Sequence, residues 1–279
     1  MSRIQEILKK AEREGTVHRT RALAPEGTVM APPQPFADPP PIPIAATPPP
    51  APRPIAFELD ARLVAAGAPH SPAAEQYRSL RARLTRAENG RAVRAIIVTS
   101  PNKGDGKSLT AANLALTMAQ EFQQRVLLLD ADLRRPSVHH LFGIAETPGL
   151  ADVLMGGATL DDALVSVGEH RLTIMPSGVV PSHPAELLGS AAMRRVLDTL
   201  RTRFDRILID MPPVAPLADV AVASSLADGV LMIVRAGVTP KPAIERALSS
   251  LDTAKVLGLV LNDAGDDGAY YGGYGYVAG

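Results

Sequence analysis

Short runs of apolar residues recur through the part of the chain that follows residue 57, and polar stretches of helical length separate most of them. Uninterrupted apolar runs are typical of parallel strands that are buried on both faces. Strands that alternate with helices predict an α/β domain, with a predominantly parallel sheet covered by helices on both faces. We place this domain at residues 57–264. The predicted strands are 95–99, 125–130, 172–175, 207–210, 230–234 and 256–261, and the predicted helices include 72–86, 109–122, 191–204 and 242–254.

Two different segments precede the domain. Residues 2–14 carry apolar side chains at helical spacing, which predicts a short amphipathic helix within residues 1–15. It is either a docking helix for a partner or a frayed terminus. Residues 16–56 hold thirteen of the 26 prolines. Proline fixes φ and removes a backbone donor, so this arm is expected to be a disordered, semi-rigid linker rather than a ligand for a proline-reading module.

Composition excludes several kinds of site. The 29 basic residues balance 29 acidic ones, so no nucleic-acid partner is expected. The absence of cysteine excludes a disulfide framework, a thiolate metal site and a cysteine nucleophile. No apolar run approaches the roughly 18 residues that span a bilayer, so we expect a cytoplasmic protein.

The stretch between the first predicted strand and the following helix is Ser-Pro-Asn-Lys-Gly-Asp-Gly-Lys-Ser, residues 100–108. A strand, a glycine-containing loop and a helix in this order place backbone N–H groups around an anion, as in P-loop NTPases. Lys107 would reach the β- and γ-phosphates and Ser108 would bind Mg²⁺. Pro101 stands where the first glycine of the motif is usual. The predicted nucleotide contacts are Lys103, Gly104, Asp105, Gly106, Lys107, Ser108 and Leu109.

Acidic residues follow two of the predicted strands. Asp130 and Asp210 each end a strand, and Asp132 lies two residues beyond the first. An aspartate at a strand end often caps a helix. Two of them downstream of a phosphate loop favour metal and base roles instead. Asn262 ends the last strand and could contact adenine or form a turn.

Residues 265–279 form a glycine-rich tail with four of the five tyrosines of the chain. Its spacing fits neither helix nor strand, which predicts a flexible segment. Beside a nucleotide site, we interpret these tyrosines as phosphoryl acceptors that enter another molecule's active site. The alternative is an aromatic tail that adheres to surfaces. The candidate acceptors are Tyr270, Tyr271, Tyr274 and Tyr276.

Glu75, Arg78 and Arg81 share one side of the predicted helix 72–86. An ion pair within the helix between Glu75 and Arg78 is one interpretation. A stripe of guanidinium groups that binds carboxylates of a neighbouring subunit is the other.

Together, these residues resemble the bacterial tyrosine kinases, cytoplasmic autokinases that regulate polymerisation and export of capsule and exopolysaccharide. The resemblance covers roughly residues 70–279. It depends on the phosphate loop, the segment Leu-Leu-Leu-Asp-Ala-Asp-Leu-Arg-Arg-Pro at 127–136, the segment Ile-Leu-Ile-Asp-Met-Pro-Pro at 207–213, the Glu75/Arg78/Arg81 pattern and the tyrosine tail.

The resemblance implies Mg²⁺ and ATP as cofactors and tail phosphorylation between subunits. It implies that Lys107, Asp130 and Asp132 are catalytic and that Ser108, Asp130 and Asp210 hold the metal. It associates the Glu75/Arg78/Arg81 helix with ring-shaped homo-oligomers, and it raises the expectation that Asn262 contacts adenine. A separate membrane-anchored polysaccharide co-polymerase would recruit and activate the chain at the plasma membrane, and a cognate tyrosine phosphatase would reverse the reaction.

Two other functions remain open at this point. One is a positioning ATPase similar to the Min and Par families, which carry a signature lysine where this chain has Asn102. The other is a nucleotide-gated scaffold without useful turnover. ATP hydrolysis into water would favour the first, and ATP bound without any product would favour the second.

Overall fold

The computed structural model describes residues 58–88, 90–121, 124–167, 171–214 and 219–265. All of them belong to one compact unit. The predicted helix at residues 1–15, the proline-rich arm and the four tail tyrosines lie outside the described residues.

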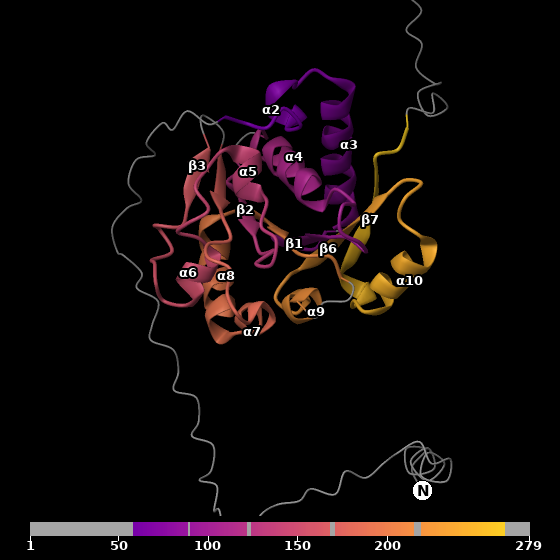
Figure 1. The fold of residues 1–279 in the computed structure, drawn as a ribbon. Coiled ribbons are helices and arrows are strands. Elements are labelled where there is room, and N and C mark those ends of the chain that lie inside the picture. Colours follow the sequence, from indigo (N-terminus) through magenta and orange to yellow (C-terminus); the bar gives the residue numbers. More distant parts are fainter. Residues whose placement is uncertain (1–57, 89, 122–123, 168–170, 215–218, 266–279) are drawn as a thin grey trace, which may run out of the picture. The chain divides into compact units, whose positions relative to one another are not determined.

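Seven strands form one sheet in the order β3-β4-β2-β5-β1-β6-β7 (Figure 1). Every neighbouring pair is parallel except β3 and β4, which are antiparallel. The sheet is therefore predominantly parallel, as predicted, with one short antiparallel strand at an edge. The strands are β1 Ala95–Thr99, β2 Val126–Asp130, β3 Val165–Val167, β4 Leu172–Met175, β5 Arg206–Asp210, β6 Gly229–Arg235 and β7 Val256–Asn262.

Helices cover both faces of the sheet (Figure 1). One face packs against α2 Val64–Gly67, α3 Pro72–Ala87, α4 Lys107–Ala119 and α5 Val138–Phe142. The other packs against α6 Leu150–Leu154, α7 Pro184–Leu188, α8 Ala191–Arg203, α9 Asp219–Ser224 and α10 Lys241–Ser249. A single 3₁₀ turn, Thr253–Lys255, precedes β7.

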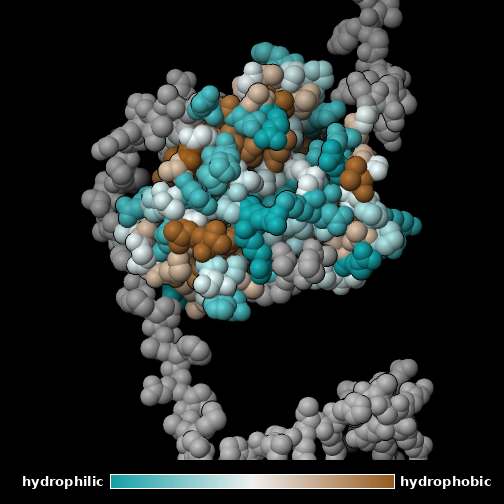
Figure 2. Space-filling model, in the orientation of Figure 1, coloured by the Kyte–Doolittle hydropathy of each residue, from teal (hydrophilic) through white to brown (hydrophobic). Residues whose placement is uncertain are grey.

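Alternation along each strand divides the core between these two layers. In β1, Ile96 and Val98 face the α4 layer, whereas Ala95 and Ile97 face the α8 layer, and all four are fully buried. This two-sided burial explains why the strands read as continuous apolar runs. The face of the molecule drawn in Figure 2 carries mainly hydrophilic side chains, interrupted by hydrophobic patches. The predicted fold class is confirmed.

Two of the four predicted helices differ from the prediction by more than one residue at an end. Helix α4 begins at Lys107, two residues before the predicted start, because the left-handed Gly106 acts as its N-cap residue. Helix α10 ends at Ser249, where residues 242–254 were expected to be helical, and a 3₁₀ turn follows. No helix in the described ranges is both long and apolar enough to cross a membrane.

The parallel strands bring the candidate residues to one edge. The carboxyl end of β1 leads into the loop at residues 100–106, and α4 follows. Asp130 and Asp210 end β2 and β5, and they are paired in register on neighbouring strands. The position where strand order reverses is the usual ligand site of such sheets.

Candidate nucleotide and phosphoryl-transfer site

The loop at residues 100–106 adopts a conformation that needs glycine at two positions. Gly104 and Gly106 have φ of +88° and +92°. A side chain is strained in this left-handed region, and glycine adopts it freely. Within the loop, the Ser100 hydroxyl donates to the Asn102 carbonyl at 2.7 Å. The geometry fits a backbone cradle at a helix N-terminus, where N–H groups bind anions.

Asp105 orders this loop from within. Its side chain is buried, and its two carboxylate oxygens accept from the Asn102 N–H at 2.9 Å and from the Thr239 hydroxyl at 2.8 Å. Thr239 also accepts from the Arg235 N–H at 2.9 Å. The Asp105 side chain therefore binds the loop to the segment between β6 and α10. Thr239 carries no signal in the sequence, because the contact joins residues 134 positions apart.

The Thr239→Val protein is expected to lose about 1–3 kcal/mol of unfolding free energy, since a buried carboxylate oxygen of Asp105 loses its donor. The loop should also hold nucleotide less tightly. Urea unfolding monitored by circular dichroism and nucleotide titration measure the two effects. Thr199→Val is the matched control, because the Thr199 hydroxyl is exposed on α8 and bonds only a carbonyl of its own helix. Equal stability of the two variants would contradict the role given to Thr239.

Asn262, at the end of β7, supports the loop from the other side. Its amide nitrogen donates to the Asp105 carbonyl at 3.0 Å. A Cβ placed at Gly106 would overlap the same amide nitrogen, so glycine is needed there for space as well as for φ. The described contact of Asn262 is with the loop backbone, and its predicted contact with adenine stays a prediction.

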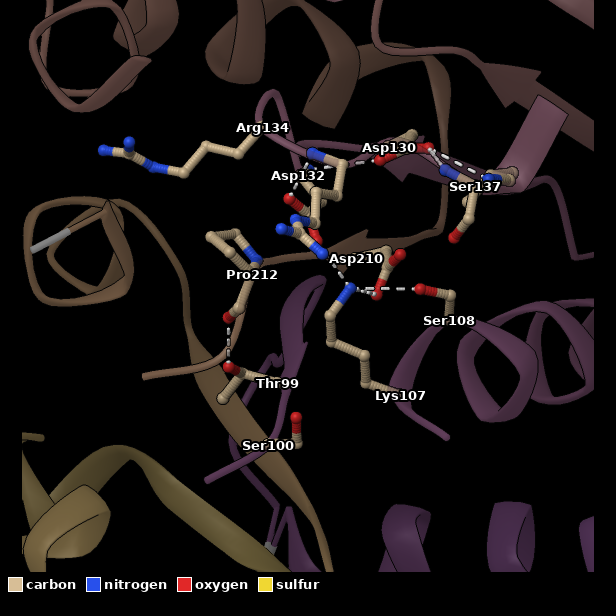
Figure 3. A network of polar contacts seen from close by, with 12 residues as sticks. Thr99, Ser100, Lys107, Ser108, Asp130, Asp132, Arg134, Ser137, Asp210 and Pro212 are labelled. Carbon is tan, nitrogen blue, oxygen red and sulfur yellow. Dashed lines mark hydrogen bonds and ion pairs between the residues drawn. The ribbon is translucent and has the colours of Figure 1, made fainter. Parts of the chain in front are cut away.

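Lys107 lies between the two acidic strand ends (Figure 3). Its Nζ is 2.8 Å from Asp132 Oδ2 and 3.4 Å from Asp210 Oδ1, and it donates to Ser108 Oγ at 3.1 Å. The two carboxylate side chains are nearly inaccessible to solvent and that of Lys107 is 12% exposed. The structure thus brings together four of the predicted site residues.

Burial and close charges shift the pKa values of this cluster. Burial alone would lower the pKa of Lys107, but the carboxylates of Asp210 and Asp132 raise it overall. Burial raises the pKa of Asp210, and the charge of Lys107 opposes that rise. Burial, followed by the charge of Asp210, raises the pKa of Asp130 to about 7. The single positive charge of Lys107 does not offset three buried carboxylates. This excess of acidic groups favours the binding of a cation.

Asp130 uses its oxygens differently from the other two aspartates. Oδ1 accepts from the Asp132 N–H at 3.1 Å, and Oδ2 accepts from the N–H groups of Ser137 and Val138 at 3.1 and 3.0 Å. These bonds fix the turn after β2 and the start of α5. This is the capping role that strand-end aspartates often play. Asp132 instead directs Oδ2 to Lys107.

Arg134 connects the turn after β2 to the start of α9. Its guanidinium donates to both carboxylate oxygens of Asp219, at 2.6 and 3.1 Å, and Asp219 is buried. Hydrogen bonding to Asp219 raises the pKa of Arg134. A bidentate pair of this kind is directional and strong. The pair links the segment after β2 to the start of α9, and the separation of 85 positions hides it from the sequence.

The Glu75/Arg78/Arg81 stripe has partners within the same chain. Arg78 Nε is 2.6 Å from a Glu75 carboxylate oxygen, and Arg78 also donates to the Pro69 carbonyl at 2.8 Å. Arg81 donates to the Thr117 carbonyl near the end of α4 at 2.9 Å. The ion pair within the helix is therefore present. The role of these residues in an oligomer stays a prediction.

The acidic groups also indicate how a metal ion would fit. Asp210 Oδ2 is buried and has no hydrogen-bond partner in the described part of the chain. The Ser108 hydroxyl, which accepts from Lys107, lies close to the Asp210 carboxylate (Figure 3). Among the described residues, no three acidic or histidine side chains are grouped to hold an ion by themselves. Mg²⁺ is usually bound by one or two carboxylates together with phosphate oxygens and water. The Ser108 and Asp210 pair fits that kind of site.

Comparison with known proteins identifies relatives both in sequence and in three-dimensional structure. Residues 91–265 match the family model ParA, described as NUBPL iron-transfer P-loop NTPase. The chain is 35% identical over 220 residues to the tyrosine-protein kinase YwqD of Bacillus subtilis, covering 78% of this chain and 92% of that relative. It is 29% identical to the kinase domain of the Escherichia coli tyrosine kinase ETK, with a TM-score of 0.68 over 72% of this chain and 79% of that one.

A solved structure from the rival class is less similar. The septum site-determining protein MinD of Pyrococcus horikoshii, complexed with Mg-ADP, is 25% identical, with a TM-score of 0.50 over 62% of this chain and 71% of that one. Both likenesses agree with a nucleotide-binding P-loop fold, and the kinases match better in sequence and in structure. The resemblance to the kinases is confirmed: the chain belongs to the bacterial tyrosine-protein kinases, which share the P-loop fold of the ParA-like NTPases.

Proposed function

We propose that the chain is an ATP-dependent protein-tyrosine autokinase, which transfers the γ-phosphoryl group of ATP to tyrosines in the tail of another copy and so regulates capsule or exopolysaccharide polymerisation and export. The carrying observation is the Lys107–Asp132 contact of 2.8 Å beside the phosphate loop. This contact supports a site that holds both a cation for phosphate and a carboxylate for a hydroxyl proton. The acceptors are Tyr270, Tyr271, Tyr274 and Tyr276.

Lys107 exchanges partners in this mechanism. Without nucleotide it balances Asp132 and Asp210. The β- and γ-phosphates of a bound nucleotide carry more negative charge than these carboxylates, so Lys107 turns toward the phosphates. Backbone N–H groups of the loop bind the same phosphates, and Lys103 and Leu109 are the remaining predicted contacts. Asp132 is then free to accept a hydrogen bond from an incoming hydroxyl.

Asp132 is the proposed general base. A tyrosine hydroxyl has a pKa near 10, so its proton must leave as the oxygen attacks phosphorus. Asp132 Oδ2 accepts that proton while the phosphoryl group passes to the tyrosine oxygen and ADP departs. The oxygens of Asp130 already accept three backbone N–H bonds, which supports Asp132 over Asp130 for this step. Asp130 keeps the turn that carries Asp132 in place.

Ser108 and Asp210 would hold Mg²⁺ together with the nucleotide phosphates. An ion held there would supply positive charge that offsets the charge of the phosphates. The buried Asp210 Oδ2, which lacks a donor among the described residues, supports this assignment. Asp130 was also predicted as a metal ligand. Its backbone bonds favour an indirect role, in which it fixes the end of β2 next to Asp210.

Tail phosphorylation in the purified protein tests the proposal. Phosphatase-treated protein incubated with Mg²⁺ and ATP should gain phosphotyrosine at residues 270–276, and tandem mass spectrometry locates each site. The initial rate per molecule should rise with protein concentration, because the acceptor tail belongs to a second copy. Release of phosphate into water without any phosphotyrosine would support a positioning ATPase instead. Nucleotide that stays bound without any product would support a scaffold.

The remaining assignments follow from the same proposal. The chain forms a ring-shaped homo-oligomer through Glu75, Arg78 and Arg81. A separate membrane-anchored co-polymerase recruits it from the cytoplasm and activates it, with residues 1–15 or the arm at 16–56 as the contact. A tyrosine phosphatase restores the tail at residues 265–279, and the domain at 57–264 carries the chemistry.

A further inference from the structure

A groove of about 690 Å³ lies at the end of the sheet opposite the phosphate loop. Its walls are the segment before β1, one side of α8, the segment between α9 and β6, and the residue before β7. Four cationic side chains and two carboxylates line it: Arg91, Arg194, Arg201, Lys255, Asp198 and Asp228. None of them takes part in the nucleotide site.

The two carboxylates of the groove are already engaged. Asp228 Oδ2 accepts from the backbone N–H groups of Arg94 and Ala95, and Asp228 Oδ1 accepts from Arg201 Nη2 at 2.9 Å. Asp198 lies 3.5 Å from the same arginine. Arg201 is therefore the cation that serves both acids, and the acids leave the other three cations without a counter-charge.

Those three cations have no carboxylate partner in the described part of the chain. Lys255 Nζ donates to backbone carbonyls, those of Ser224 and Ala227 among them, at 2.8 and 3.0 Å. Arg91 reaches only the carbonyls of Glu88 and Ala254. Arg194 is exposed, and its side chain makes no hydrogen bond or ion pair with the described residues. Carbonyls satisfy N–H donors but do not neutralise charge, so the groove carries a net positive charge.

Strand β7 begins beside this groove and ends shortly before the tyrosine tail. Lys255 directly precedes β7, and the tail follows the last residue of β7, Asn262. Seven residues of strand separate these two positions by about 23 Å at roughly 3.3 Å per residue. An extended chain reaches about 40 Å over the twelve residues from Asn262 to Tyr274 at the same rise. The tail of this chain is long enough to turn back along β7.

We propose that the phosphorylated tail of this chain folds back along β7 and binds in this groove through its phosphotyrosines, with Arg91, Arg194 and Lys255 as counter-charges. The inference rests on the proposed function, which supplies the phosphotyrosines. Each adds about −1.5 to −2 charge and three acceptor oxygens, and arginine binds such groups through parallel N–H bonds. A tail held there is withdrawn from the active site of the next copy, so the groove retains the product and favours release of the neighbour.

A synthetic peptide of residues 265–279 tests the groove without any phosphoryl transfer. The phosphatase-treated full chain is saturated with a non-hydrolysable ATP analogue, so that the phosphate loop is filled. Fluorescence anisotropy then compares a peptide phosphorylated at Tyr274 and Tyr276 with the unphosphorylated peptide. We expect the phosphopeptide to bind at least about tenfold more tightly, in line with charge-assisted hydrogen bonds. Equal binding of the two peptides would overturn the proposal.

Two charge reversals on one helix localise the site. Arg194→Glu should weaken phosphopeptide binding about tenfold, whereas Arg195→Glu should leave it within about twofold, because Arg195 is exposed on α8 but does not line the groove. Both variants change the net charge equally. Equal losses would mean a diffuse charge effect and would overturn the groove. Inorganic pyrophosphate that binds as tightly as the phosphopeptide would overturn the tail as its occupant.

The fold-back itself is tested on the autophosphorylated chain. If its own tail fills the groove, this protein should bind added phosphopeptide about tenfold more weakly than the phosphatase-treated protein, since an attached ligand acts at a millimolar effective concentration. Unchanged binding would contradict the fold-back. Phosphopeptide binding in a protein that never phosphorylates itself would reject the proposed function alone. Autophosphorylation without phosphopeptide binding would reject the groove alone.

Discussion

The Lys107→Ala protein is expected to phosphorylate its tail at least about 10²–10³-fold more slowly than the unmodified chain, since removal of a group that stabilises developing charge has effects of this size. Lys107 forms ion pairs with both Asp132 and Asp210, so its loss also leaves two buried carboxylates without that counter-charge. Quantitative mass spectrometry of residues 270–276 over a time course measures the rate.

A control variant and a stability measurement distinguish a loss of catalytic rate from a loss of folded protein. Lys241→Ala is the matched control. Lys241 is an exposed lysine at the start of α10, and among the described residues its ion pair is an exposed one with Glu245. It should retain the full rate. The midpoint of thermal unfolding should confirm that the Lys107→Ala protein is folded at the assay temperature. Tail phosphorylation at the normal rate in folded Lys107→Ala protein, free of other kinases, would reject the proposed mechanism.

The second large effect is expected for Asp132→Asn, which keeps the size of the side chain and removes the proton acceptor. General base catalysis contributes typically 10²–10⁴-fold, so the rate should fall by about that factor while nucleotide affinity stays within a few fold. Single-turnover phosphorylation and nucleotide titration measure the two quantities. A loss of affinity that accounts for the whole loss of rate would assign Asp132 to nucleotide binding instead.

Asp130→Asn is the matched comparison, and it has a separate signature in the pH dependence of unfolding. The pKa of Asp130 is raised to about 7, so the folded chain holds a proton that the unfolded chain releases above its ordinary value of 3.8. Unfolding free energy should therefore fall as pH rises between about 4 and about 7. Asp130→Asn should flatten this fall and Asp132→Asn should not. Full activity in Asp132→Asn together with none in folded Asp130→Asn would identify Asp130 as the base.

The sequence predicted the parts of this site that depend on local chain order. The apolar runs located the six longer strands, and the carboxyl ends of parallel strands necessarily brought Asp130 and Asp210 beside the phosphate loop. The short edge strand β3 was missed, because three residues give no readable periodicity. Helices of five residues, such as α6, were not predicted, for the same reason.

Contacts between distant segments could not be predicted in the same way. Asp105 was predicted as a nucleotide contact of the loop, and its side-chain bond to Thr239 was not anticipated. The Arg134–Asp219 pair likewise joins segments with no shared pattern. Such contacts depend on loop conformations that residue spacing does not encode. Glu75 and Arg78 offered two interpretations in the sequence, and the structure adds the Pro69 carbonyl as a second partner for the arginine besides Glu75.

The amide of Asn262 has a mechanical consequence. It grips the main chain of the phosphate loop at Asp105, and it belongs to the last residue of β7, from which the tyrosine segment departs. A neighbouring copy or a fused tag can exert force on that segment. The hydrogen bond between Asn262 and Asp105 then transmits this force to the backbone of the phosphate loop. Asn262 therefore joins the tyrosine segment and the phosphate loop through one residue.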